Sequence, residues 1–359
     1  MGVVLGRILA PSVLLVIFGL LALFSVAPSL LPNQFFFFLL GLAFFFTLSQ
    51  TDYRVFLPLG KFFFFLSLFL LFSLFLFAPR VRGTVRWFEL GPFQFQPSEI
   101  SKPLLILFFA SILSKKEEFN LRSFFSLFTL ILLPVGLVVK EPDLGTGGIF
   151  LIVWLGMMIA AGCPLKIIFI FSLLVFPFLS YFWQFLKGYQ KLRILSFLNP
   201  HLDPLGTGYN VIQAQIAIGS GRIFGKGLGF GTQSHLRFLP ERYSDFVFAT
   251  LAEEIGFLGS IFLLATFFFL IYQIFKIAQK TNDSFGSLLC IGIGVQLLVQ
   301  VFVNIGMNLG IVPITGVTLP FVSYGGSSLV SSFIALGLVA SVGKRELISS
   351  PVDIHFQKE

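Results

Sequence analysis

Residues 61–78 read KFFFFLSLFLLFSLFLFA, one lysine followed by seventeen residues that carry no charge. A helix that crosses the hydrocarbon core of a bilayer needs about 20 mostly apolar residues. The stretch is close to that length, and Asp, Glu, Lys and Arg are absent from it after Lys61. It therefore predicts a membrane-spanning helix.

The rest of the chain has a similar composition. Of its 359 residues, 56% are hydrophobic and 11% are charged, and the mean hydropathy is +0.95. A soluble domain is about 45–50% apolar and about 25% charged. The composition excludes an ordinary soluble enzyme and a disordered chain. The 51 phenylalanines contribute apolar bulk rather than chemistry.

Ten apolar runs divide the chain. We expect an all-α polytopic membrane protein, a single domain over residues 1–359 with about ten transmembrane helices. The first run ends at Ser25-Val26-Ala27 and has features of a signal peptide, but nine further runs make a retained helix the better interpretation. The ten expected helices span residues 8–27, 34–50, 61–78, 99–114, 124–139, 146–162, 165–185, 245–275, 286–308 and 323–342.

The positions of Lys and Arg predict the orientation, because basic residues favour cytoplasmic loops. The short loops 28–33 and 309–322 contain no Lys or Arg, so we place them outside. Both termini are then cytoplasmic, with 344–359 as a short tail. Segment 186–244 becomes one large extracytoplasmic loop, in which we expect short amphipathic helices, notably around 209–219. The short segment 79–98 keeps three arginines on the outer side, against the rule.

The remaining composition excludes several other sites. The net charge is +8, which we assign to topology and anionic lipid rather than to nucleic acid. Cys163 and Cys290 lie in apolar runs and have neither disulfide nor metal-ligand spacing. The three histidines also show no zinc-binding pattern.

Acidic residues are rare, and an ionisable group near a span is a functional hypothesis by default. The sequence Lys140-Glu141-Pro142-Asp143 interrupts apolar sequence. One interpretation is a broken helix whose backbone lines a cavity. The other is a plain turn between two spans, and the residues alone do not decide between them.

Asp245 follows the sequence Leu239-Pro240-Glu241-Arg242-Tyr243-Ser244 and begins a predicted helix. A helix cap would explain Ser244 or Asp245 alone. It does not explain Glu241, Arg242 and Asp245 together at a membrane boundary. An Asp beside basic groups at the mouth of a cavity is a plausible general base.

Two further pairs of charged residues lie in predicted helices. Glu253 and Glu254 are adjacent, so they face different ways, and pairing with a buried Lys or Arg is the favoured role. Glu99 and Lys102 are three residues apart, which places them on one helix face. A local ion pair explains them as well as a site does.

Three other motifs carry basic or small residues. Arg86-Trp87 fits an interfacial aromatic anchor or a lipid-phosphate contact. The glycine-rich run 219–231 has neither dinucleotide nor P-loop spacing, but its Arg222 and Lys226 fit an anionic headgroup. Ser323, Gly325 and Gly326 open a helix, where small residues favour close packing more often than a bound phosphate.

Several of these segments together resemble the RodA/FtsW/SpoVE family, the SEDS polymerases of the bacterial cell wall. The resemblance rests on 140–146, 225–259 and 304–328, with support from Arg86-Trp87 and 96–102, and it runs in order from about residue 80 to 342. Segments 231–234 and 304–307 look more like RodA than FtsW. The family often has Gln where Glu141 stands here.

The resemblance implies a peptidoglycan glycosyltransferase in the bacterial cytoplasmic membrane that acts on lipid II at the outer face and works with a class B penicillin-binding protein. It places the essential acid on Asp245, as the base in an inverting displacement of undecaprenyl pyrophosphate. Candidate substrate-binding residues are Arg86, Lys102, Lys140, Arg222, Lys226, Glu241 and Arg242. Structural or supporting residues are Trp87, Glu99, Asp143, Glu253, Glu254, Ser323, Gly325 and Gly326. A divalent cation, Mg²⁺ or Mn²⁺, is a possible cofactor, and no metal ligand is assigned.

Two alternatives use the same outward cavity. A lipid II flippase would move substrate without making polymer. A scaffold that only recruits the transpeptidase would keep full function after Asp245→Asn. The division-specific, FtsW-like polymerase is a third reading within the same family.

Overall fold

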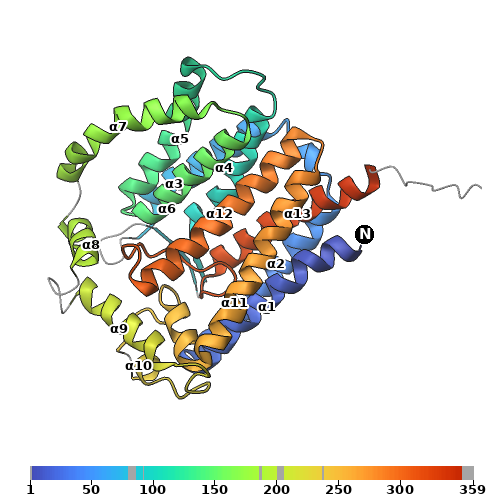
Figure 1. The fold of residues 1–359 in the computed structure, drawn as a ribbon. Coiled ribbons are helices and arrows are strands. Elements are labelled where there is room, and N and C mark those ends of the chain that lie inside the picture. The colour runs from blue at the N-terminus through green and yellow to red at the C-terminus, as the bar shows by residue number, and fades with distance from the viewer. Residues whose placement is uncertain are drawn as a thin grey trace, which may run out of the picture.

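A computed structural model describes residues 2–79, 86–91, 93–185, 188–199, 206–236 and 238–349. In these ranges the chain is almost entirely helical (Figure 1). The ten helices that coincide with predicted spans are α1 Gly2–Val26, α2 Leu31–Gln50, α3 Gly60–Phe77, α4 Pro97–Leu113, α5 Leu121–Lys140, α6 Leu144–Ala160, α7 Leu165–Phe185, α11 Val247–Lys280, α12 Ser284–Leu309 and α13 Gly326–Ser349.

Each predicted span overlaps one of these helices over most of its length, so the fold class predicted from the sequence is confirmed. Seven of the helices that the structure describes are long and apolar enough to cross a bilayer: α1, α2, α3, α5, α11, α12 and α13. The helices α4 and α6 are apolar but have 17 residues each. The predicted tail 344–359 begins inside α13, and residues 350–359 lie outside the described ranges.

Shorter elements connect the helices. They are η1 Pro28–Leu30, η2 Tyr53–Phe56, and the antiparallel strands β1 Phe88–Leu90 and β2 Phe93–Phe95, which pair Phe88 with Phe95. Segment 186–244 contains α8 Gly188–Leu198, α9 Thr207–Ser220 and α10 Thr232–His235. The helix expected around 209–219 is therefore present as α9. These three helices lie outside the bundle, at the left and bottom of Figure 1.

Helix α3 has one face buried in the bundle and one face exposed at the surface. Gly60, Phe64, Ser67 and Leu71 recur every three or four residues and are buried, as one face of an α-helix requires. A Cβ on Gly60 would overlap the Ser111 side chain of α4, so the two helices pack closely there. The opposite face of α3 carries the exposed rings Phe62, Phe65, Phe69, Phe72 and Phe75.

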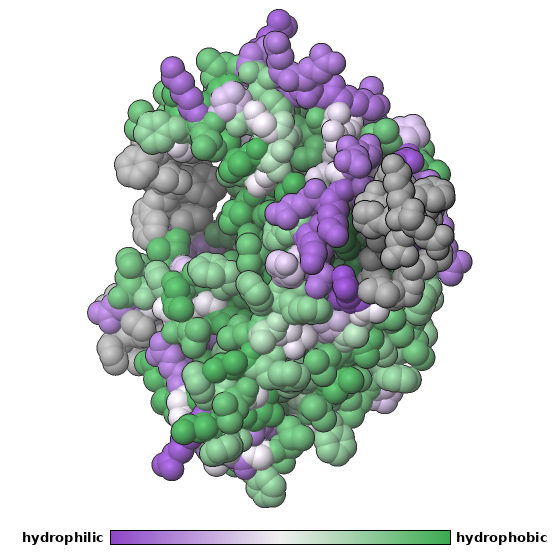
Figure 2. All heavy atoms as spheres, turned by 45° about the vertical axis from the view of Figure 1, so that its right-hand side comes forward, coloured by the Kyte–Doolittle hydropathy of each residue, from purple (hydrophilic) through white to green (hydrophobic). Residues whose placement is uncertain are grey.

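Figure 2 shows the same division over one side of the molecule: hydrophobic side chains cover most of it and hydrophilic ones gather in separate patches. In a bilayer, lipid tails would cover such a surface. Helix α13 lies inside, packed against α2, α4 and α12. Together with α12 it forms the buried centre of the bundle.

Helix α11 has a break at Gly256, whose φ of 69° and ψ of −166° are not helical. The glycine-rich segment docks into this break. The backbone N–H groups of Lys226 and Gly227 donate to the carbonyls of Glu253 and Glu254 at 3.0 and 2.9 Å. A Cβ on Gly256 would overlap the backbone of Phe224 and Gly225, so only glycine allows this close approach.

Candidate functional site

Asp245 is a half-buried residue in the turn that precedes α11. The backbone N–H groups of Ser244 and Phe246 both donate to the Glu241 carbonyl at 3.2 Å, which closes the turn. Ser323 reaches this turn from the loop before α13, and its Oγ donates to the Ser244 carbonyl at 2.6 Å. The turn before α11 and the loop before α13 therefore meet beside Asp245.

The protein around Asp245 raises its pKa to about 7. Burial is the largest cause, because displacing water disfavours the charged carboxylate. Glu241 raises the pKa further by like-charge repulsion, while Arg193 and Arg86 oppose the shift. A carboxyl group with a pKa near 7 is divided between its acid and base forms at neutral pH, the condition under which a general base works best.

Arg86 joins the Asp245 region to the turn between α5 and α6. Its Nε donates to the Glu141 carbonyl at 3.2 Å, and its guanidinium also bonds the Pro142 carbonyl. Its Cζ lies 6.0 Å from the centre of the Trp87 ring. The structure thus brings Arg86, Trp87 and the 140–143 motif together.

The 140–143 motif itself is a plain turn, because α5 ends at Lys140 and α6 begins at Leu144. Asp143 caps α6 and accepts hydrogen bonds from the Thr146 N–H and Oγ1 at 3.1 and 3.0 Å. The Glu141 carboxyl is fully buried, and neither of its oxygens has a hydrogen-bond partner among the described residues. Burial, with Asp143 adding repulsion, raises the Glu141 pKa to about 9, so Glu141 is neutral at pH 7.

Lys140 has a different environment. Its side chain is exposed at the end of a groove between α3 and α5, with a volume of about 490 Å³. The groove is otherwise lined by apolar residues: Leu68, Phe69, Phe72, Leu132, Leu133, Gly136 and Leu137. A long apolar chain fits such a surface, and Lys140 offers a charge at its end.

Lys102 is held inside the bundle. Its Nζ lies 2.6 Å from Glu99 Oε1, and both side chains are almost fully buried. Ser331 of α13 donates to the Glu99 carbonyl at 2.7 Å. The structure therefore realises the i, i+3 ion pair.

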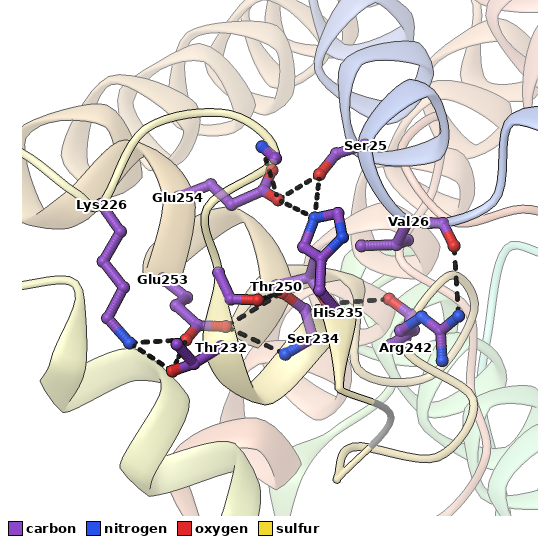
Figure 3. A network of polar contacts seen from close by, with 12 residues as sticks. Ser25, Val26, Lys226, Thr232, Ser234, His235, Arg242, Thr250, Glu253 and Glu254 are labelled. Atoms are coloured by element: carbon purple, nitrogen blue, oxygen red, sulfur yellow. Dashed lines mark hydrogen bonds and ion pairs between the residues drawn. The ribbon is translucent and has the colours of Figure 1, made fainter.

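Glu253 organises the docked glycine-rich segment (Figure 3). Its Oε1 accepts from Lys226 Nζ at 2.8 Å and the Gln233 N–H at 3.0 Å, and its Oε2 accepts from the N–H and Oγ of Ser234 at 3.1 and 3.0 Å. The expectation that Glu253 pairs with a Lys or Arg is realised by Lys226. Lys226, which was predicted to bind substrate, therefore forms an ion pair within the protein.

Glu254 points toward α1 instead, as adjacent helical residues must (Figure 3). Its carboxylate accepts a hydrogen bond from Ser25 Oγ and lies 3.3 Å from His235 Nε2, and Ser25 Oγ lies 2.9 Å from the same nitrogen. Arg242 donates to the Val26 carbonyl at 3.1 Å. Arg242 and Glu254 thus fasten the end of α1 to the outer segments.

The remaining predicted residues are Arg222, Glu241, Gly325 and Gly326. Arg222 and Glu241 are exposed. The Gly325 N–H donates to Gln34 Oε1 at 3.3 Å, and a Cβ on Gly326 would overlap the Phe37 ring of α2. Close packing, rather than a bound phosphate, therefore accounts for Gly326.

Sequence reasoning missed Arg193, Asn304 and Asn308 as site residues. Arg193 is one of seven basic residues in segment 186–244, and nothing local distinguishes it from the others. The two asparagines carried a signal, because they lie four residues apart in an apolar span and therefore share one helix face. Both donate to the Asp245 carbonyl.

The residues described in the structure contain no group of three His, Cys, Asp or Glu side chains that could hold a metal ion. Of the acids that influence Asp245, Asp143 is used as a helix cap and Glu241 is exposed.

Comparisons with known proteins find relatives that cover most of this chain. The peptidoglycan glycosyltransferase MrdB of Escherichia coli K12 is 39% identical over 316 residues, which cover 87% of this chain and 85% of MrdB. A chain from a peptidoglycan synthase complex that coordinates polymerization and crosslinking superposes with a TM-score of 0.80 at 32% identity, covering 94% of this chain and 97% of the other. The rod shape determining protein RodA of Thermus thermophilus gives a TM-score of 0.72 at 30% identity, covering 95% and 97%.

The family described as "Cell cycle protein", which unites FtsW, RodA and SpoVE, matches residues 4–347. The match includes Asp245, Arg86 and the segments on which the resemblance was based. This chain is therefore a member of the FtsW/RodA/SpoVE family, with RodA-like relatives.

Proposed function

We propose that this chain, a peptidoglycan glycosyltransferase by its family and relatives, polymerises lipid II into β-1,4-linked glycan at the outer face of the bacterial cytoplasmic membrane. The observation that carries the proposal is the environment of Asp245, a half-buried residue whose carboxyl group has a pKa of about 7 and lies within the influence of Arg86 and Arg193. A base and positive charge are the two requirements of the transfer.

The reaction follows from the chemistry of the substrate. The acceptor sugar's 4-hydroxyl passes its proton to the Asp245 carboxylate while its oxygen forms a bond to the anomeric carbon of the donor. The bond from that carbon to the pyrophosphate breaks, and the pyrophosphate leaves with the electron pair. The α-linked donor becomes a β-linked product, so the displacement inverts. General-base help of this kind is worth roughly 10²–10⁴-fold.

Two features support substrate binding. Arg86 is held at the 141–142 turn by two hydrogen bonds, and a fixed cation stabilises negative charge that develops on a leaving group. The apolar groove that ends at Lys140 suits a polyprenyl chain with its phosphate at the lysine. A divalent cation enters the proposal only as a companion of the pyrophosphate, and no step is routed through it.

The cellular setting is part of the proposal. Both termini lie in the cytoplasm and Asp245 faces outward, as the distribution of Lys and Arg predicts. The partner is a class B penicillin-binding transpeptidase, in line with the structural relative from a peptidoglycan synthase complex. The RodA-like relatives favour a role in cell elongation and shape rather than in division.

The test uses purified protein with and without its matched transpeptidase, labelled lipid II, and gel analysis of glycan. Wild type, Asp245→Asn and Asp283→Asn are compared, with folding checked for each. Asp283 is the matched control, because it caps α12 through the Gly286 N–H at 2.9 Å and Asn caps a helix about as well as Asp. We expect polymer from wild type and Asp283→Asn only.

The other outcomes discriminate among the alternatives. Equal polymer from Asp245→Asn would remove Asp245 as the base while keeping the enzyme. If wild type makes no polymer with its partner and added Mg²⁺ or Mn²⁺, the polymerase proposal fails. Translocation of lipid II in liposomes would then favour the flippase.

A further inference from the structure

Three consecutive backbone carbonyls at the candidate site accept hydrogen bonds from distant parts of the chain. The Tyr243 carbonyl accepts from the Tyr324 N–H at 2.8 Å, and the Ser244 carbonyl accepts from Ser323 Oγ at 2.6 Å. The Asp245 carbonyl accepts from two side chains of α12. The turn that carries the carboxyl group is therefore held at three consecutive residues, 243–245.

The two side chains on the Asp245 carbonyl are Asn304 and Asn308, both fully buried. Their Nδ2 atoms lie 3.1 and 3.0 Å from the Asp245 oxygen. A carbonyl oxygen has two lone pairs, so two donors occupy its full capacity. Asn304 Nδ2 also donates to the Val317 carbonyl at 2.8 Å, which ties the loop after α12 to the same point.

Asn308 takes the place of a helical hydrogen bond. In a continuous helix the Ala249 N–H would bond to the Asp245 carbonyl four residues earlier. Here the Ala249 N–H donates to Asn308 Oδ1 at 3.1 Å while Asn308 Nδ2 donates to the Asp245 carbonyl. One side-chain amide thus bridges the two backbone groups. It couples Asp245 to α11 without making it part of the helix.

The Asn304 side chain makes its hydrogen bonds through its amide nitrogen. Its Nδ2 makes both hydrogen bonds described above, whereas its Oδ1 has no partner among the residues described. The amide nitrogen therefore makes the connection between Asp245 and the 317 segment.

We propose that Asn304 and Asn308 are positioning residues for the glycosyl transfer, holding the Asp245 backbone so that its carboxyl group faces the acceptor hydroxyl. The inference rests on the proposed function of Asp245. Neither asparagine touches the reacting atoms, and both act through the backbone of the base. A misplacement of about 1 Å is enough to reduce a rate about 10²-fold.

If the asparagines position Asp245 in this way, two kinetic effects are expected. Asn304→Leu keeps the approximate volume of the side chain and removes both donations, so kcat should fall about 10–100-fold, while KM for lipid II changes little. Once its backbone is released, the Asp245 carboxyl gains water, and its pKa moves down toward the ordinary value because burial is the main cause of the shift. The acid limb of the pH–rate profile should therefore move to lower pH.

Gln300→Leu is the matched control. Gln300 lies one turn before Asn304 on the same helix, is equally buried, and bonds Gln296 at 3.1 Å. This variant should keep the wild-type kcat and pH profile. A merely structural loss would lower the amount of active enzyme at every pH and would leave the acid limb in place.

Ser323→Ala provides the second variant if Asn304→Leu does not fold. It removes the single donation to the Ser244 carbonyl and should produce a smaller fall in kcat in the same direction. Folded variants with wild-type kcat and an unmoved acid limb overturn the inference. If those variants keep the wild-type kcat while Asp245→Asn is inactive, the inference fails and the proposed function is retained. If Asp245→Asn is active, the proposed function is itself refuted.

Discussion

The contact between Lys226 and Glu253 separates two roles for Lys226. If the lysine holds the docked segment in place, Lys226→Met lowers the free energy of unfolding and leaves KM for lipid II unchanged. If it binds the pyrophosphate, the same change raises KM and leaves stability intact. The structure favours the first result, because Nζ lies 2.8 Å from a Glu253 carboxylate oxygen that is itself fully buried.

The expected magnitudes follow from the number of donors. Without Lys226, Glu253 still accepts from Gln233 and from both donors of Ser234. A hydrogen bond to a charged group is worth about 1.5–3 kcal/mol, and the 27% exposure of Lys226 places the loss near about 1 kcal/mol. Glu253→Gln removes the negative charge that pairs with Lys226 and replaces one of the two buried acceptor oxygens by an NH2 group, which faces donors it cannot accept from. This change should cost about 3–5 kcal/mol. The double variant should cost less than the sum of the two.

Unfolding in mixtures of SDS and a mild detergent, followed by circular dichroism, measures these differences. Lys166→Met is the control, because Lys166 is an exposed lysine on α7 and its loss should be neutral. An unchanged stability for Lys226→Met together with a tenfold or greater rise in KM, about 1.4 kcal/mol of lost binding, would refute the structural role.

Three further predictions concern the break in α11, the buried Glu141 and the positive charge near Asp245. Gly256→Ala should destabilise the protein by about 3 kcal/mol or more, because the backbone conformation of Gly256 is strained for other residues and a Cβ would overlap the docked segment. Thermal unfolding of the variant measures this loss. Glu141→Gln should raise the melting temperature more at pH 8 than at pH 5. The pKa of Glu141 is about 9 in the folded state, so the wild-type protein loses stability as the pH rises from about 4.5, and the variant does not. Equal shifts of the melting temperature at both pH values would contradict a buried neutral acid. Arg86→Gln should move the acid limb of polymerisation to higher pH, because Arg86 lowers the Asp245 pKa; a limb that stays in place or moves down would exclude that influence.

The bundle could be predicted from the sequence because each span is a local property. Length and apolarity are sufficient to locate a membrane helix, and all ten predicted runs coincide with helices. The break at Gly256 could not be predicted. A glycine inside an apolar run is compatible with a continuous helix, and the reason for the break is a segment about 30 residues earlier in the chain, which docks against it.

The candidate site was also predicted only in part. Asp245 stood out locally, because charges are rare near spans. The partners of the charged residues depend on tertiary contacts: Lys226 and Glu253 are 27 residues apart, and Asn304 and the Asp245 carbonyl are 59 apart. Only a folded chain places these groups together, so the sequence indicated which residues matter without showing what each one contacts.

The break in α11 has a consequence for how the enzyme tolerates different membranes. A straight helix of 34 residues would be about 51 Å long, well beyond the roughly 30 Å hydrocarbon core. Gly256 separates a short piece, residues 247–255, from a long piece, residues 257–280. The docked segment holds both pieces, because it donates to the Glu253 and Glu254 carbonyls of the short piece and accepts from the Phe257 and Leu258 N–H groups of the long piece at 2.8 and 3.1 Å. A change in the tilt of the long piece with bilayer thickness would therefore be transmitted through the docked segment to the short piece and to the turn that carries Asp245.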